Sequence, residues 1–426
     1  MGKRIQNAGL KLFTGVMGSI ERAQSGVVFN PFSAEVLKDP YPAYRALRER
    51  DPVHRSWLGA GVVLTRFADI RQMLNDPRLG NDLHLANWWK WIEKRQIKAG
   101  RTQEELDDPN LIMSDPPRHT RLRALVNKAF TPDSIRALAP KVERIARELL
   151  DEAGGSGEIE IVDSLAYPLP MLAIAELMGI PIEDRDQFRQ WSDDMSGSTG
   201  SFALKDIRRS VDGDHAIHRY LHGIVEQRRK DPQDDLLTRL VHAEENGDRH
   251  SMQELLALCS LLLVAGNMTT RGLISNGLYA LLRNPEQIQR LRETPELLTE
   301  GINELARYDS SVQLVARFAR EDIELHGKRI KKGTMISMLA GAANRDPERY
   351  VEPDRLDLSR DNSQFLVFGH GIHFCLGHYL ARMNARIAIG TLLERHRKIQ
   401  FSAVEPKWGT NWVMRSLESL PVSVSD

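Results

Sequence analysis

The chain is poor in cysteine, shows no excess of charge of either sign, and has no long hydrophobic run. Its 426 residues include two cysteines, Cys259 and Cys375, which excludes a disulfide framework and a four-cysteine zinc site. Its 58 basic residues balance 58 acidic ones, so bulk binding to nucleic acid is not expected. The longest apolar run, Leu255 to Gly266, has about 12 residues, whereas a membrane-spanning helix needs roughly 20. These absences predict a cytoplasmic protein that does not cross a membrane.

What the sequence does contain is a succession of helical patterns with few strand-like segments between them. No Pro/Ser-rich linker, charge block or internal repeat divides the chain, so we expect a single domain over residues 29–426, preceded by an N-terminal extension over residues 1–28. The predicted fold class is mainly α with small β-sheets. Helical patterns cover residues 117–150, 165–178, 184–229, 234–246, 252–283 and 285–308, and β-like segments cover residues 316–318, 323–325 and 335–339.

Cys375 is the single cysteine of the run from Phe368 to Gly377, which reads Phe-Gly-His-Gly-Ile-His-Phe-Cys-Leu-Gly. The segment after it has apolar residues at helical spacing, so the thiol should lie at a helix N-terminus, where the helix dipole lowers its pKa. A thiolate that binds haem iron needs such an environment. An ordinary core cysteine is the alternative. A dinucleotide-binding loop is disfavoured because Phe374 occupies the position of the third glycine.

The pattern Phe-x-x-Gly-x-His-x-Cys-x-Gly resembles the haem-binding signature of the cytochrome P450 family, the haem-thiolate monooxygenases. The layout of the chain from about Asn30 to the C-terminus is similar to that of the family. This resemblance implies a cytochrome P450 fold, a single haem-containing domain, and haem b (iron protoporphyrin IX) as cofactor. It also implies that Cys375 is the iron ligand and that Phe368, Gly371 and Gly377 belong to the loop that passes close to the haem.

His119 and Arg123 lie four residues apart in a predicted helix, so one helix face presents two donors to an anion. Haem carries two propionates, which favour guanidinium and imidazole partners. The resemblance adds Arg317 and His373 to this propionate-binding role. The alternative is a set of solvated charges on a helix surface.

Glu304 and Arg307 place an acid and a base three residues apart on one helix face. Taken alone, the pair is best interpreted as an ordinary surface ion pair of little energetic weight. About 70 residues before a haem-type cysteine, however, it resembles the Glu-x-x-Arg pair of the family. The resemblance completes this network with Arg355 and implies a structural role, in which a buried and fully paired cluster supports the cysteine loop.

The helical pattern over residues 252–283 contains Ala265, Gly266, Asn267, Met268 and Thr269 at its centre. The resemblance implies that the small Ala265-Gly266 pair lets dioxygen and substrate approach the haem, and that the Thr269 hydroxyl contacts dioxygen and relays protons. The family commonly has an acid where this chain has Met268, and a thioether cannot carry a proton. Asn267 can orient water but cannot titrate. Proton delivery must therefore use water and another side chain, or oxygen activation is unusual.

Positions that match the substrate pocket of the family are bulky and apolar, which favours a small hydrophobic substrate. They would also suit a plain core. The candidate pocket residues are Val264, Val312, Leu314, Val315, Trp412 and Val413.

The expected activity is the hydroxylation or epoxidation of such a substrate with O2, as in secondary metabolism. The chain has no cysteine set for an iron–sulfur cluster. Electrons should therefore come from a separate ferredoxin or flavodoxin with its reductase, docked on the cysteine side near Arg121, Lys128 and Arg382. Two alternatives remain. One is a haem-thiolate enzyme with other chemistry, such as peroxide-driven oxidation, coupling or desaturation, and the other is a non-catalytic ligand-binding accessory protein.

Overall fold

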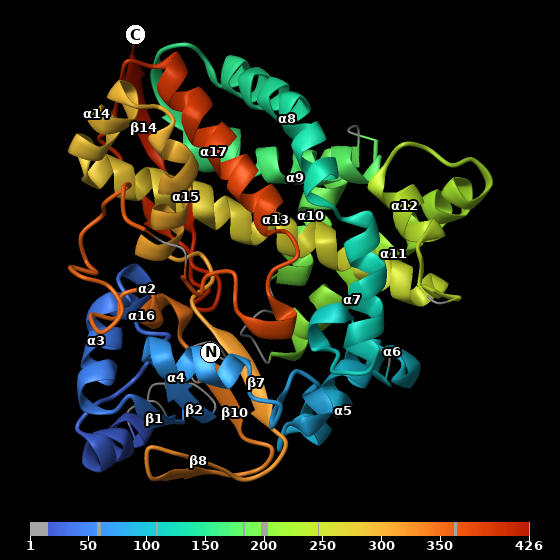
Figure 1. Cartoon of the computed structure of the whole chain (residues 1–426), viewed down its shortest axis with the longest axis vertical. Helices are drawn as coiled ribbons and strands as arrows, with labels where there is room; N and C mark the ends of the chain where they lie inside the picture. The colour runs from blue at the N-terminus through green and yellow to red at the C-terminus, as the bar shows by residue number, and fades with distance from the viewer. Residues whose placement is uncertain are drawn as a thin grey trace, which may run out of the picture.

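The computed structural model describes residues 16–57, 61–107, 110–181, 184–196, 203–245, 247–361 and 364–425 of the chain. Helices fill most of the molecule, and a small sheet that contains β1, β2, β7 and β10 occupies one end of it (Figure 1). The predicted fold class, mainly α with small β-sheets, is confirmed.

The α-helices are α2 (Ala34–Lys38), α3 (Tyr41–Arg50), α4 (Phe67–Leu74), α5 (Trp89–Ala99), α6 (Gln103–Asp107), α7 (Arg118–Ala129), α8 (Pro132–Ala153), α9 (Pro168–Met178), α10 (Arg185–Ser196), α11 (Leu204–Lys230), α12 (Leu236–His242), α13 (Met252–Arg283), α14 (Pro285–Glu293), α15 (Leu297–Tyr308), α16 (Ala340–Ala343) and α17 (His378–Arg395). Shorter helical turns are η1 (Leu83–Leu85), η2 (Leu111–Met113), η3 (Val162–Ala166) and η5 (Gly371–His373).

The strands are β1 (Val53–Ser56), β2 (Gly61–Leu64), β3 (Leu79–Gly80), β4 (Gly157–Glu160), β5 (Glu244–Glu245), β6 (Asp248–Arg249), β7 (Val315–Ala319), β8 (Ile323–Leu325), β9 (Lys328–Ile330), β10 (Met335–Met338), β11 (Lys398–Phe401), β12 (Lys407–Trp408), β13 (Leu417–Ser419) and β14 (Pro421–Ser425).

The long helix α13 crosses the interior of the molecule (Figure 1). It begins at a capping box, in which the Ser251 hydroxyl and the Glu254 carboxylate each accept a backbone N–H bond of the first turn. It ends before Pro285, which disfavours helical backbone at the preceding Asn284. Among the described residues, α13 is the one helix that is long and apolar enough to cross a membrane. Its packing against α9, α11, α15 and α17 accounts for that composition, since it forms the centre of the main core.

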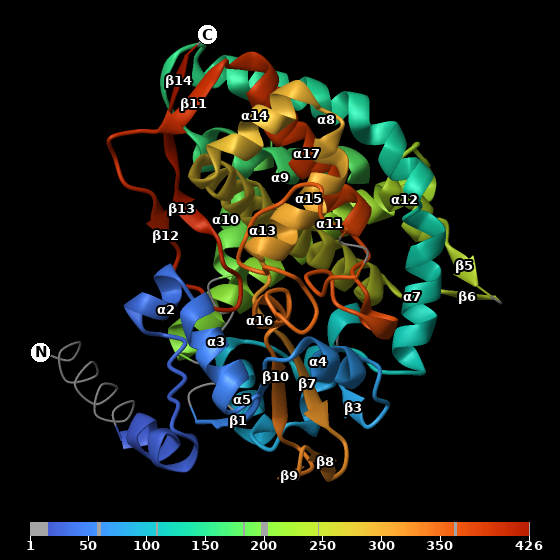
Figure 2. The ribbon, with the colours of Figure 1, turned by 60° about the vertical axis from the view of Figure 1, so that its left-hand side comes forward.

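The larger sheet joins strands that are far apart in the sequence. Its strand order is β1-β2-β10-β7-β3, so the early strands β2 and β3 pair with the late strands β10 and β7, and β1 pairs with β2. Strand β10 pairs with β7 in antiparallel register, with Ile336 opposite Arg317. Figure 2 shows this sheet at one end of the molecule. At the other end lie β11 and β14, which pair with each other, and β14 also pairs with β4. The sheet therefore fixes the position of Arg317 relative to the helical part.

The described part of the N-terminal extension, residues 16–28, packs on the domain. Residues 16–25 are helical, and the Glu21 side chain of this helix is fully buried. Its carboxylate accepts hydrogen bonds from the backbone N–H groups of Phe29 at 3.0 Å and Trp57 at 2.8 Å, and lies 3.4 Å from His54 Nε2. Residues before position 29 therefore contribute a buried anchor to β1.

Candidate functional site

The loop around Cys375 is held in shape by its own backbone. The Cys375 N–H donates to the Phe368 carbonyl at 2.9 Å, which closes the loop into a turn. Gly371 has a φ of +74°, and a Cβ atom there would meet the Leu74 carbonyl oxygen at 2.8 Å, so both the backbone conformation and the space require glycine. Helix α17 begins at His378, three residues after the thiol. The predicted position of Cys375 at the start of a helix therefore holds.

The predicted pKa of the thiol itself was wrong. Burial raises the pKa of Cys375, and this effect outweighs the hydrogen bond from the Gly377 N–H and the positive charges of Arg123 and Arg382. The helix start alone does not produce a thiolate. A bound metal ion deprotonates a coordinating thiol outright. The Gly377 N–H, Arg123 and Arg382 would then stabilise the negative charge on the Cys375 sulfur.

A cluster of cationic and imidazole side chains from three segments lies beside this loop. The rings of His119 on α7 and His373 on η5 are 4.0 Å apart between centroids. Arg123, one turn after His119, donates to the carbonyl of Phe374 at 2.8 Å. Arg317 on β7 is buried and acts electrostatically on both imidazoles. The structure thus brings together the four residues that were predicted to hold propionates.

In the described part of the chain no acidic side chain pairs directly with this cluster. Asp115 acts on Arg317 and His119 only electrostatically, and its own ion-pair partner is Arg320 at 2.6 Å. Neither Arg123 nor Arg317 forms an ion pair among the described residues, and neither ring nitrogen of the buried His119 has a hydrogen-bond partner. Burial lowers the pKa of Arg317 to about 10, and burial together with His119, Arg317 and Arg123 lowers the pKa of His373 to about 3. Buried donors without an anion are costly. The donor set therefore fits a ligand with carboxylates, and Cys375 supplies the sulfur that a haem iron takes.

The centre of α13, a helix that packs against α17, has a half-buried face. Val264, Ala265, Gly266, Met268 and Thr269 are half-buried although the helix lies inside the molecule. A Cβ atom on Gly266 would meet nothing within 4 Å. The Thr269 hydroxyl donates to the Ala265 carbonyl at 2.8 Å, a bond within the helix.

Asn267 does not share this face. Two residues before Thr269, it points about 200° around the helix from it. It is buried, and neither atom of its amide has a hydrogen-bond partner among the described residues. That Asn267 orients water stays a prediction, but helical geometry directs its side chain away from Thr269. Met268 is nearer to the Thr269 side, but its thioether cannot relay a proton.

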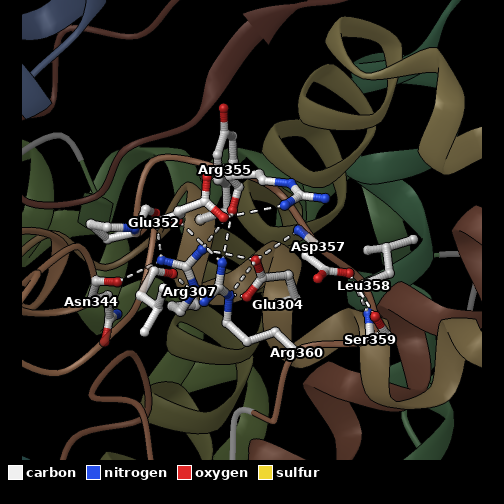
Figure 3. Close-up of polar contacts among 12 residues, drawn as sticks. Glu304, Arg307, Asn344, Glu352, Arg355, Asp357, Leu358, Ser359 and Arg360 are labelled. Carbon is white, nitrogen blue, oxygen red and sulfur yellow. Dashed lines mark hydrogen bonds and ion pairs between the residues drawn. The ribbon is translucent and has the colours of Figure 1, made fainter.

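Glu304 and Arg307 form the buried network that the resemblance implied. Both side chains are fully buried, and they are joined by two hydrogen bonds, Nε to Oε2 at 2.7 Å and Nη2 to Oε1 at 2.8 Å (Figure 3). Arg307 also donates to the carbonyls of Asn344 and Pro353, both at 2.8 Å. These bonds connect α15 to the polypeptide that leads toward the cysteine loop.

The third arginine of the network is Arg360 and not Arg355, so that prediction was wrong. Arg360 Nε donates to Glu304 Oε1 at 3.2 Å, and the guanidinium also bonds the Val351 carbonyl at 2.7 Å. The Arg355 side chain is largely exposed and pairs with Glu352, so only its carbonyl takes part, accepting from Arg307 at 3.3 Å (Figure 3). Both arginines lie in an irregular loop, where no periodicity distinguishes the inward side chain from the outward one.

The candidate pocket residues fall into two groups. Val264, Val312 and Val315 are half-buried, and an isolated bridge between Val312 and Met414 brings the two predicted pocket segments side by side. Leu314, Trp412 and Val413 instead belong to a cluster under the N-terminal segment. In that cluster the Trp412 ring meets the rings of Phe29 and Phe32 at about 6 Å. The second group therefore packs on the protein itself.

A half-buried cysteine loop, four donors suited to two carboxylates, and a half-buried face on the interior helix α13 are together the features of a haem-thiolate protein. Comparison with known sequences agrees, since residues 92–417 match the sequence profile named Cytochrome P450. The chain is 40% identical over 399 residues to Cytochrome P450 107B1 of Saccharopolyspora erythraea, covering 92% of this chain and 96% of that one. The chain belongs to the cytochrome P450 family and is a haem-thiolate monooxygenase.

Two solved structures extend the comparison. The chain is 36% identical to the bacillaene polyketide synthase cytochrome P450 PksS of Bacillus subtilis, with a TM-score of 0.85 over 94% of this chain and 100% of that one. It is 32% identical to P450BioI in complex with acyl carrier protein ligated to hexadec-9Z-enoic acid, with a TM-score of 0.84 over 92% of this chain and 99% of that one.

Proposed function

We propose that this protein hydroxylates or epoxidises a small hydrophobic molecule, free or carried as an acyl chain, with O2 and with electrons from a separate ferredoxin or flavodoxin. The observation that supports it most is the half-buried face of α13 at Ala265, Gly266 and Thr269, on the helix that packs against α17, and α17 begins directly after the Cys375 loop. Similarity to a polyketide cytochrome P450 and to one that binds an acyl carrier protein favours a hydrophobic substrate of secondary metabolism. The cytoplasm is the compartment we propose.

The residues of the chain hold the haem, shape the space above it and control protons. Cys375 would bind the iron, while His119, Arg123, Arg317 and His373 would hold the propionates. When bound, haem supplies the dioxygen-activating chemistry. Gly266 keeps the helix face open, and hydrophobic side chains exclude bulk water from it. These residues position a C–H or C=C bond of the substrate over the cofactor.

Proton delivery differs from what an acid at position 268 would give. Met268 has no proton to transfer, and Asn267 points away. The Thr269 hydroxyl already donates its hydrogen to the Ala265 carbonyl, so its oxygen is left to accept a hydrogen bond from water. We propose that water reaching Thr269 is the proton source. The absence of an acid at Met268 also favours a second candidate function, peroxide-driven oxidation, because peroxide supplies the electrons and protons that O2 would need from elsewhere.

The electron donor should dock on the cysteine side, but through other contacts than those expected. Arg121 is bound to Glu254 and Asp248, and Arg382 donates to Asn303 at 2.7 Å and lies over the Phe368 ring. Their charges are already engaged. Lys128 is exposed at the end of α7 and remains a candidate contact for an acidic partner.

The function is tested by optical titration of the haem-loaded protein with terpenes, fatty acids, steroids and macrolides. A saturable low-spin to high-spin shift of the Soret band with one class, followed by product formation with O2, NADPH, ferredoxin and reductase, is the expected result. Val312→Phe should weaken the shift, whereas Val351→Phe, which alters an 81% exposed surface residue, should leave it unchanged. Product formed equally well with peroxide alone would favour the second candidate, and binding without product under either supply would overturn both.

A further inference from the structure

A basic surface lies on the outer faces of α5 and α11, away from the cysteine loop. We call it the basic face. Its charged residues are all exposed and comprise Lys90, Lys94, Lys98, Lys205 and Arg208. Two large apolar side chains of α5 accompany them, Trp91 at 48% and Ile97 at 47% exposure. The Arg95 guanidinium stacks over the Trp91 ring at 4.3 Å and holds it in place.

The two helices form one continuous surface. Arg208 on α11 donates to the carbonyl of Lys98 on α5 at 3.1 Å. Directly beneath this bond, Ala99 packs against Ile207 and Val211 in a small apolar cluster. The lysines of α5 therefore keep a fixed position relative to those of α11, so that a partner would meet a preformed arrangement of charges.

Acidic side chains also lie near the basic face, and they include the half-buried Asp206 of α11, next to Lys205, and the exposed Glu104 of α6. Glu93, the one acid on α5, is half-buried and accepts from Gln103. Asp194 of α10 pairs with Arg209, and Asp212 is exposed at the edge. A surface hollow of about 590 Å³ between α10 and α11 adjoins Lys205 and Arg208. The positive charge of this region is thus not cancelled within the described part of the chain.

The basic face lies on the outside of the wall that encloses the haem site. The inner side of α5, Trp89 and Ile92, packs in one cluster with Phe318, the neighbour of the predicted propionate ligand Arg317. The inner side of α11 reaches α13 through Asp214, which accepts from the Ser260 hydroxyl at 3.0 Å. A molecule bound here would be separated from the site by a single layer of helices.

We infer that the basic face docks a small acidic carrier domain that presents a tethered acyl substrate to this enzyme. The inference rests on the proposed function and specifies how its substrate arrives. Lysines around an exposed tryptophan give the charged rim and aromatic anchor typical of protein interfaces. A membrane surface fits less well. A helix that lies in a bilayer needs a continuous apolar stripe turned outward. The two exposed apolar side chains of α5, Trp91 and Ile97, are instead about 120° apart around the helix, with lysines between them.

The test compares two double charge reversals in the haem-loaded protein. Lys94→Glu/Lys98→Glu alters the basic face, and Arg397→Glu/Lys398→Glu alters an equally exposed basic pair at β11. The probe is a fluorescent acyl carrier protein that bears a hexadecyl chain on its phosphopantetheine sulfur, joined by a stable thioether in place of the natural thioester. Anisotropy measures its binding, and the Soret band separately reports entry of free hexadecanoic acid.

We expect the first variant to bind the carrier about tenfold more weakly at low ionic strength, with a reduced salt dependence, and the second to change binding less than about twofold. Both should keep the Soret shift with the free acid. Equal carrier binding by wild type and the first variant would overturn the inference. If the wild type bound no carrier but bound phosphatidylglycerol vesicles, and the first variant lost that vesicle binding, the inference would be overturned in favour of a lipid surface. If the first variant bound the carrier more weakly than wild type but free hexadecanoic acid produced no Soret shift, docking on the basic face would be upheld and the proposed substrate class contradicted.

Discussion

Exchanging Arg360 and Arg355 for alanine separates the network seen in the structure from the one that the sequence suggested. Arg360 is mostly buried and donates to the Glu304 carboxylate and to the carbonyls of Val351 and Glu352. Arg360→Ala removes these bonds and leaves Glu304 with Arg307 as its remaining arginine partner. Arg355→Ala removes an exposed pair with Glu352.

The two substitutions should differ clearly in their effect on stability. Hydrogen bonds to charged groups contribute about 1.5–3 kcal/mol each, and partial compensation by water leaves about 2–4 kcal/mol lost for Arg360→Ala. At roughly 2.1 cal/mol/K per residue, the unfolding entropy of a chain of this length is about 0.9 kcal/mol/K, so Tm should fall by about 2–4 °C. Exposed ion pairs contribute little, and Arg355→Ala should shift Tm by less than about 1 °C.

The assay is thermal unfolding followed by far-ultraviolet circular dichroism at one fixed scan rate, with haem content measured on the same samples. Glu304→Gln serves as the severe reference, since it takes the buried charge away from Arg307 and should cost about 3–5 kcal/mol. If Arg355→Ala lowered Tm as much as Arg360→Ala, the assignment of Arg360 to the network would be refuted.

Cys375→Ala should abolish the thiolate-type absorption of the reduced carbon monoxide complex, and retention of that spectrum would refute the ligand assignment. Arg317→Leu should lower haem content after purification, because it removes a buried cation from the propionate cluster. Arg320→Leu, three residues later, should not lower it. Pyridine haemochrome analysis measures the haem content of both variants. Met268→Glu should raise the ratio of product to NADPH consumed, and an unchanged ratio would show that water already delivers protons efficiently. Burial would raise the pKa of Glu21, but hydrogen bonds from His54, Phe29 and Trp57 outweigh it and lower that pKa. The stabilisation from buried, ionised Glu21 is therefore fully present above the ordinary carboxyl pKa and is lost as the pH falls through the lowered pKa of Glu21. Backbone amides of residues 16–25 should then exchange hydrogen faster in acid.

The sequence was sufficient to predict features that follow from periodicity or from a compact motif. The helical pattern over residues 252–283 matches α13 at both ends, because a capping box and a proline mark them. The Cys375 loop and the His119–Arg123 pair are also local, since spacing along one turn or one helix determines which side chains share a face.

What the sequence could not show depends on long-range packing. Nothing local distinguishes Arg360 from Arg355, because the inward arginine is defined by its contact with Glu304 on α15, which lies 56 residues earlier in the sequence. The pKa of Cys375 follows from burial by the whole fold, which opposes the local helix effect. The pocket assignment of Trp412 failed for the same reason, since the N-terminal aromatic rings that cover it lie almost 400 residues earlier, with Phe29 among them.

The strand order of the larger sheet has a consequence for biosynthesis. Strand β2 ends at Leu64, and its parallel partner β10 begins at Met335. At roughly 5–20 residues per second, β2 leaves the ribosome on the order of 10–50 s before β10 is made. Throughout that interval β1 and β2 can form a hairpin but have no sheet to join, and their apolar residues have no core to cover them. The strand that carries Arg317 arrives in the same late segment, so a newly made chain can hold its cofactor only when translation is nearly complete.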